Sequence, residues 1–159
     1  MSEQKKIEQA KVTFDTLCQT LERLEWSYKK DQDNLSIECG AQGEDLPMKI
    51  NINVDIDRML IMLISHMPFT ITEDKRLDVA VAVSAVNAAL IDGSFDYDIT
   101  SGYVLFRMTN SFIENTISEE VFSYMLHCSC QTIDEYNDKF LMLSKGMIST
   151  EQFLSMCAF

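Results

Sequence analysis

The sequence predicts an α+β fold in which helices pack on an antiparallel sheet of about five strands. Two kinds of spacing support this. Apolar residues that alternate with polar ones mark several segments as strands, and apolar residues three and four positions apart mark others as helices. The predicted order is helix, three strands, helix, two strands and then one or two helices. The 159 residues contain no repeat and no linker-like stretch, so we expect one domain over residues 1–159.

The first predicted helix has a continuous apolar face. Side chains spaced three and four residues apart lie on the same side of a helix. The residues with this spacing are Ile7, Ala10, Phe14, Leu17, Leu21 and Leu24. We expect the helix to end near Trp26, where a polar turn begins at Tyr28.

Three strands are predicted next. Residues 35–39 and 48–56 alternate between apolar and polar side chains, which is typical of antiparallel strands with one solvated face. Residues 58–66 are apolar on both faces, and we therefore expect this strand to be covered on both sides. A short turn around Asp55–Asp57 joins the last two strands as a hairpin.

The second predicted helix, Lys75–Ile91, is apolar on nearly every side and should be buried on more than one of them. We expect its bulky row to face the sheet: Val79, Val83, Val86 and Leu90. A row of smaller residues offers close approach to another helix: Asp78, Ala82, Ala85 and Ala89. Gly93 supplies the left-handed residue that closes the helix.

The remaining segments are two strands and then helices. Residues 95–99 and 103–109 form a second predicted hairpin, and Ser118 caps a helix that runs to Gly146. A capping-box pattern at Thr132 suggests that this helix restarts there. A second such pattern at Ser149 predicts a final short helix through Met156.

Charge and cysteine content restrict the partners. The net charge of −12 and the scattered basic residues argue against nucleic acid and against an anionic membrane surface. The five cysteines and the charged amino terminus indicate reduced thiols in a cytoplasmic protein. His66 and His127 lie in different elements, and Cys128 and Cys130 point to opposite sides of a helix. We expect no metal site and no cofactor.

Catalytic motifs are equally weak. The sequence has no nucleophile elbow and no phosphate-binding glycine loop. The pairs Asp55–Asp57 and Asp96–Asp98 each share a strand face and offer two carboxylates to a cation, but alternation places them on the wet face or in turns. We therefore expect a protein without enzymatic activity and without catalytic residues. A hydrolase that uses Asp96 and Asp98 stays as a minor alternative.

Most of the ten methionines are expected to fill the core, because unbranched thioethers adapt to irregular packing. Met67 and Phe69, which flank Pro68 beside a loop, form the best candidate for an exposed apolar contact.

Residues 7–146 resemble the YbjN-like family of bacterial sensory-transduction regulators. The segments that carry the resemblance are Lys75-Arg76-Leu77, Val86-Asn87-Ala88-Ala89-Leu90, Gly93-Ser94-Phe95-Asp96-Tyr97-Asp98, Gly102-Tyr103-Val104-Leu105-Phe106-Arg107 and Ile117-Ser118-Glu119-Glu120. Residues 147–159 look like a helical addition.

This resemblance implies a fold like that of type III secretion chaperones, whose members are homodimers that hold an extended segment of a secreted protein. It also implies structural roles for four residues. Asn87 would lie at the helix end, Gly93 at the turn, Phe95 on the core face and Arg107 on the last strand. The resemblance makes none of them catalytic.

Our leading hypothesis is a non-enzymatic, cytoplasmic protein-binding or chaperone-like regulatory module that binds another protein or forms a homodimer. Its candidate partner-binding residues are Met67, Phe69, Ala82, Ala85 and Ala89. The alternative is a signalling regulator that binds a small ligand in a pocket between sheet and helices. That alternative predicts that Arg107 or His66 points inward.

Overall fold

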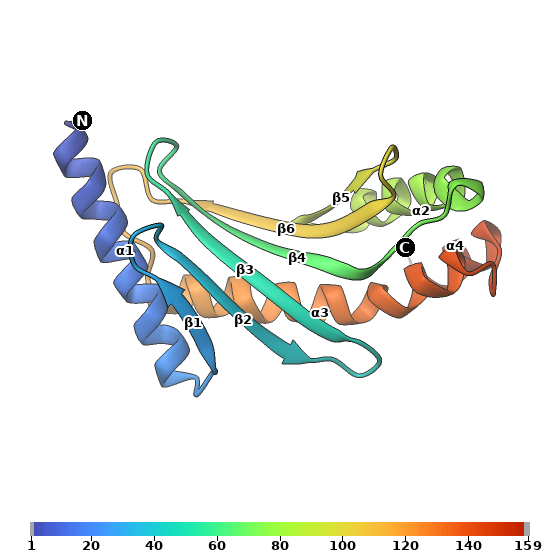
Figure 1. The fold of residues 1–159 in the computed structure, drawn as a ribbon, viewed down its shortest axis with the longest axis horizontal. Coiled ribbons are helices and arrows are strands. Elements are labelled where there is room, and N and C mark those ends of the chain that lie inside the picture. Colours follow the sequence, from blue (N-terminus) through green and yellow to red (C-terminus); the bar gives the residue numbers. More distant parts are fainter. Residues whose placement is uncertain (1, 158–159) are drawn as a thin grey trace.

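A computed structural model describes residues 2–157 and shows an antiparallel sheet with helices packed on it (Figure 1). The elements are α1 (Glu3–Arg23), β1 (Tyr28–Asp31), β2 (Ser36–Gln42), β3 (Pro47–Asp55), β4 (Leu60–Thr70), the 3-10 turn η1 (Glu73–Lys75), α2 (Arg76–Ala89), β5 (Ser94–Asp98), β6 (Tyr103–Ser111), α3 (Glu119–Ser144) and α4 (Thr150–Met156). The α+β class and the predicted antiparallel sheet are confirmed.

The six strands are ordered β1-β2-β3-β4-β6-β5. Strands β1 to β4 follow one another as hairpins, and β6 then inserts between β4 and β5. The centre of the sheet is therefore β4, in which Ile64 lies opposite Asn51 of β3 and Arg107 of β6. All pairings are antiparallel.

The strand count exceeds the prediction by one. We expected a polar turn from Tyr28, but Tyr28–Asp31 forms β1, which pairs with residues 36–39 of β2. Three of its four residues are charged, so it has no apolar alternation that would reveal it. Backbone hydrogen bonds to β2 hold it at the sheet edge, where exposed lysines are common.

The core lies between one face of the sheet and the helices. Helices α1, α2 and α3 contact β3, β5 and the β4–β6 pair, respectively. Phe95 lies at one end of this core, as predicted, and its ring packs edge-on against Phe106, Phe140 and Tyr136 at centroid distances of 5.2, 5.1 and 5.8 Å. Such aromatic contacts add to the stabilisation by apolar burial.

Two expectations about the last helices have opposite outcomes. α3 is continuous from Glu119 to Ser144, so the predicted restart at Thr132 is wrong. The side chain of Asp134 instead accepts a hydrogen bond from the backbone N–H of Glu44, at 2.8 Å, and ties the β2–β3 loop to α3. The capping box of α4 is confirmed, since Ser149 and Gln152 bond to each other's backbone N–H groups.

The second helix is shorter than predicted. α2 ends at Ala89, and Leu90 is already extended, so Gly93 is not the residue that closes it. Gly93 does adopt the left-handed conformation, with φ of 73°, in the loop that leads into β5.

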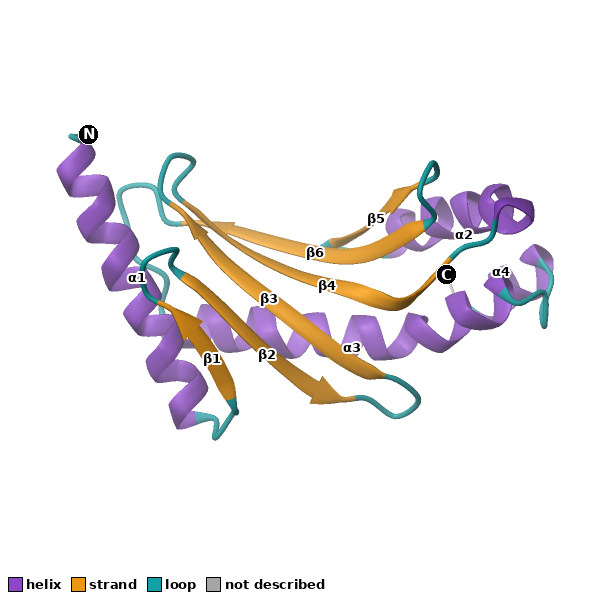
Figure 2. Cartoon of the chain, viewed as in Figure 1, coloured by secondary structure: helices purple, strands orange, loops and turns teal. Residues whose placement is uncertain are grey.

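The face of the sheet opposite the helices has no cover among residues 2–157 (Figures 1 and 2). The expectation that residues 58–66 are covered on both sides is therefore wrong. Ile61 and Leu63 are buried under the helices, but Met62 and Ile64 point to the other face and stay half-exposed. We call this uncovered side the open face.

Among residues 2–157, none of the helices combines the length and the apolarity that crossing a membrane requires.

Candidate functional site

The first candidate site is an apolar strip on the solvent side of α2. Leu77 and Val81 are 75% and 52% exposed, although both are large and apolar. Together with smaller neighbours they line a shallow groove. We call this strip the α2 outer face, and its residues are Leu77, Ala80, Val81, Ser84, Ala85 and Ala88.

Only one side of α2 is buried by the rest of the chain. Val79, Ala82, Val83 and Val86 are buried, and the helix packs against α3, α4 and β5. The expectation that α2 is buried on more than one side around its whole surface is therefore wrong for the α2 outer face.

The candidate row Ala82, Ala85 and Ala89 does not lie on one accessible surface. Ala82 is fully buried in the core, Ala85 is half-buried and Ala89 is exposed. Three- and four-residue steps drift around a helix, so the row winds from the buried side to the solvent. Ala85 is the member that also lines the α2 outer face.

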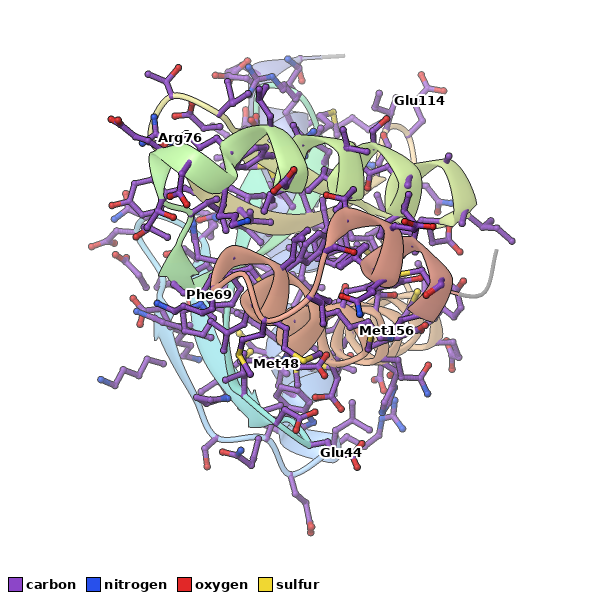
Figure 3. All side chains as sticks on the ribbon, turned by 90° about the vertical axis from the view of Figure 1, so that its right-hand side faces the viewer. Glu44, Met48, Phe69, Arg76, Glu114 and Met156 are labelled. Carbon is purple, nitrogen blue, oxygen red and sulfur yellow. The ribbon has the colours of Figure 1, made fainter. Side chains whose placement is uncertain are left out.

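α4 lies beside α2 and extends the surface at this end of the molecule. Figure 3 looks at that end, with α2 above α4 and with Arg76 and Met156 at the sides. Met147 and Met156 are 71% and 45% exposed, and Ile91, just after α2, is 97% exposed. Exposed large apolar side chains are therefore concentrated around α2 and α4 as well as on α2 itself.

Met67 does not form the exposed contact that we expected. β4 extends through residues 67–70, and alternation along it turns Met67 to the inner face, where it is 5% exposed. Phe69 is partly buried and packs against the core. The predicted loop is thus part of a strand, and burial of Met67 follows from the strand period.

The second candidate site is the open face. Along β4, Leu60, Met62 and Ile64 form a half-exposed apolar ridge. Polar residues flank it on both neighbouring strands, because Met62 lies between Asn53 and Thr109 in the register. An apolar centre with a polar rim is the usual composition of a protein interface.

Three ion pairs between neighbouring side chains lie around this ridge. They join Lys49 to Glu38 at 3.3 Å, Arg58 to Asp55 at 3.0 Å and Arg107 to Asp96 at 3.0 Å. The backbone N–H of Arg58 bonds to Asp55 and, with the guanidinium, holds the pKa of that carboxyl below its usual value.

Arg107 and His66 both lie on the open face and not in the interior. The inward orientation that a ligand pocket between sheet and helices requires is therefore wrong for both residues. The space beneath the sheet is instead filled by apolar side chains, among them Phe106, Phe122 and Phe140.

Two pockets lie on the open face along β6, one on either side of the Arg107–Asp96 ion pair. The first is lined by Arg58, Leu60, Met62, Gly93, Ser94, Arg107 and Thr109. The second is lined by His66, Asp96, Tyr97, Asp98, Ser101, Tyr103 and Leu105. One pocket thus holds two arginines, and the other holds two aspartates.

The acidic pair Asp96–Asp98 has structural partners. Asp96 accepts two hydrogen bonds from the guanidinium of Arg107. Asp98 accepts from the hydroxyl of Ser101 and the backbone N–H of Thr100, and these bonds lower the pKa of its carboxyl. Within residues 2–157, no three His, Cys, Asp or Glu side chains gather closely enough to hold a metal ion.

The cysteines carry no sign of an activated thiol. All five are unpaired. Burial raises the pKa of Cys39 to about 12 and that of Cys130 to about 11, so both are held as neutral thiols. Reactive cysteines have the opposite shift, because the thiolate is the nucleophile.

Sequence reasoning missed the α2 outer face and the open face as sites. Leu77 and Val81 were available as signals, because they lie four residues apart opposite the buried valines. The apolar residues on the second face of β4 were a signal as well, but we interpreted them as a sign of cover from within the chain.

Comparisons with known proteins agree with this fold. Residues 13–142 match the family model YbjN, described as "Putative bacterial sensory transduction regulator". The chain is similar to the crystal structure of YbjN from E. coli, described as "a putative transcription regulator", with a TM-score of 0.57, 18% identity, and coverage of 78% of this chain and 90% of that chain. It is also similar to the HopA1-SchA chaperone-effector complex, with a TM-score of 0.48, 15% identity, and coverage of 79% and 90%. No curated protein matches it.

Proposed function

Since this chain belongs to the YbjN family, we propose that it is a non-enzymatic, cytoplasmic protein-binding module that pairs with a second copy through the α2 outer face. The family match confirms the resemblance inferred from the sequence. The observation that carries the proposal is the exposure of Leu77 and Val81 on a helix whose opposite side is buried. Unpaired cysteines support a reducing compartment.

The α2 outer face is favourable for self-association because it lacks charge. A protein of net charge −12 repels a second copy over most of its surface. None of the side chains that line the α2 outer face is charged, and Ser84 is its one polar member. Apolar surface exposed in this way usually marks a contact with another protein.

The shape of the strip also fits a second copy. Its bulky residues, Leu77 and Val81, lie in the first half of α2, and its small residues, Ala85 and Ala88, lie in the second half. A two-fold axis near Ser84 makes two α2 helices antiparallel and places each bulky half over a small half. Small residues allow the two helices to approach closely.

The pairing needs more surface than α2 alone offers. A stable interface buries about 800 Å² on each partner, whereas a helix of 14 residues is only about 21 Å long. Ile91, Met147 and Met156 are exposed near the same end of the molecule and supply further apolar area. We therefore place the interface on α2, α4 and the loop after α2.

The test is the molar mass in solution, measured by light scattering over a wide range of concentration. We expect twice the chain mass of 18.2 kDa. Val81→Lys should shift the protein toward monomer, because a charge in a dry interface costs roughly 2 kcal/mol or more, about 30-fold in Kd.

Val12→Lys is the matched control. Val12 is 48% exposed on α1, close to the 52% of Val81, but lies outside the proposed interface. This variant should remain dimeric. A wild-type chain that is monomeric at every concentration would overturn the proposal, and so would equal dissociation of both variants.

A further inference from the structure

The open face of the sheet has an apolar surface that pairing through α2 leaves uncovered. β4 is the central strand, and its side chains are apolar on both faces. One face packs under the helices, whereas Leu60, Met62 and Ile64 point to the open face (Figures 1 and 2). A central strand that is apolar on both faces is typical of a sheet with both faces covered.

The two pockets along β6 give this surface a direction. Thr109 lines one pocket and Leu105 lines the other. These residues are four positions apart on one strand, which corresponds to about 13 Å. Both pockets are open to solvent from the same side, since Thr109, Arg107 and Leu105 share the open face of β6. The pockets therefore form a furrow parallel to the strand, with the Arg107–Asp96 pair in its middle.

The ends of the furrow have opposite charge. Arg58 and Arg107 line the pocket beside Met62, and Asp96 and Asp98 line the pocket beside Leu105. An extended chain repeats its side-chain direction every second residue, so residues i and i+4 face the same way and lie about 13 Å apart. That separation equals the distance along β6 between the two pockets.

We propose that this furrow binds an extended segment of a partner protein that carries an acidic and a basic residue four positions apart, with an apolar residue midway between them. The acidic side chain lies beside Arg58 and Arg107, and the basic side chain lies beside Asp96 and Asp98. The apolar side chain contacts the ridge of Met62 and Ile64. Charge complementarity of this kind sets register and specificity.

A single extended segment fits this surface better than a helix does. A helix with its side chains is about 10–12 Å across, whereas neighbouring strands of the sheet are only about 4.8 Å apart. The furrow lies along one strand, β6, between the side chains of β4 and β5. The proposal fixes the order of charges along β6 and leaves the chain direction of the segment to the experiment.

The probes are short blocked peptides of five residues, with valine in the middle and threonine on either side of it. One has glutamate first and lysine last, and a second has the reverse order, so that both chain directions are sampled. Two further peptides carry glutamate at both ends or lysine at both ends. We expect one of the mixed-charge peptides to shift amide resonances of β4, β5 and β6 in an NMR titration and to bind about tenfold more tightly than either like-charged peptide.

A charge exchange tests the pockets directly. Asp96→Arg combined with Arg107→Glu keeps the net charge and the ion pair but reverses its direction, and should weaken the preferred mixed peptide about tenfold. Glu38→Lys combined with Lys49→Glu is the matched control, since this ion pair also lies on the open face but does not line either pocket. The control should bind with unchanged affinity.

Three outcomes would overturn the proposal: equal binding of all four peptides, resonance shifts confined to α2, or equal effects of the two charge exchanges. The titration is repeated with Val81→Lys, which removes pairing through α2. Binding by this variant supports the furrow whether or not the chain forms dimers, so failure of one proposal is distinguishable from failure of the other.

Discussion

The side chain of Asn87 holds the backbone of Phe95 through two reciprocal hydrogen bonds. Its amide nitrogen donates to the Phe95 carbonyl and its amide oxygen accepts from the Phe95 N–H, both at 2.8 Å. One residue of α2 thus fixes the position of β5. Because Phe95 packs on Phe106 and Phe140, the same contact also orients one end of the core.

Replacement of Asn87 should destabilise the fold. Asn87→Ala leaves both the N–H and the carbonyl of Phe95 without these partners, which costs about 1–3 kcal/mol of unfolding free energy. Urea denaturation measures the loss. Ser84→Ala, on the exposed side of the same helix, controls for effects on α2 itself and should stay within about 0.5 kcal/mol. Equal stability of the two variants would contradict the role of Asn87.

Two glycines with positive φ allow a second comparison. Gly93 and Gly146 have φ of 73° and 68°, but a Cβ at Gly93 overlaps the ring of Phe106, whereas one at Gly146 meets only Lys75, at 3.4 Å. Gly146→Ala should cost about 1–2 kcal/mol from the backbone conformation alone. Gly93→Ala should cost roughly 1–3 kcal/mol more, because the core must shift. Equal losses in thermal or urea unfolding would show that Phe106 gives way freely.

Alkaline pH should destabilise the protein through its buried thiols. The ordinary pKa of 9.0 is raised to about 12 for Cys39 and to about 11 for Cys130 by burial. The unfolded chain therefore releases these protons first, and the free energy of unfolding falls as pH rises above about 9. The measurement is urea unfolding between about pH 8 and 11, compared with the double variant Cys39→Ala and Cys130→Ala. The variant should lose less stability across that range, and parallel curves would contradict this origin.

Most of the fold could be predicted from the sequence where apolar spacing carries the information. α1, β3 and α4 follow directly from helical spacing, alternation and a capping box. β1 could not be predicted in this way, because a charged edge strand is held by backbone bonds to β2 and not by side-chain burial. Thr132 is misleading for a related reason, since a capping-box pattern inside a long amphipathic helix does not interrupt it.

The candidate sites were harder to predict because periodicity does not identify what covers an apolar face. The sequence of α2 shows apolar residues on every side, but only tertiary packing decides that Ala82 is buried and Leu77 is exposed. The same holds for β4, where Leu63 and Ile64 look equivalent in the sequence and lie on opposite faces of the sheet. The furrow brings Arg58 and Arg107 together across strands, and no linear motif encodes that contact.

The central claim, that two copies pair through antiparallel α2 helices, is tested most directly by disulfide cross-linking at single introduced cysteines. Ser84→Cys lies near the proposed two-fold axis, so its two copies should come within the ~7 Å between Cα atoms that a disulfide allows. Leu77→Cys lies seven residues away, which separates its two copies by about 21 Å. The account predicts a covalent dimer under oxidising conditions for Ser84→Cys and none for Leu77→Cys. Cross-linking that is absent at position 84, or as strong at position 77, would contradict it.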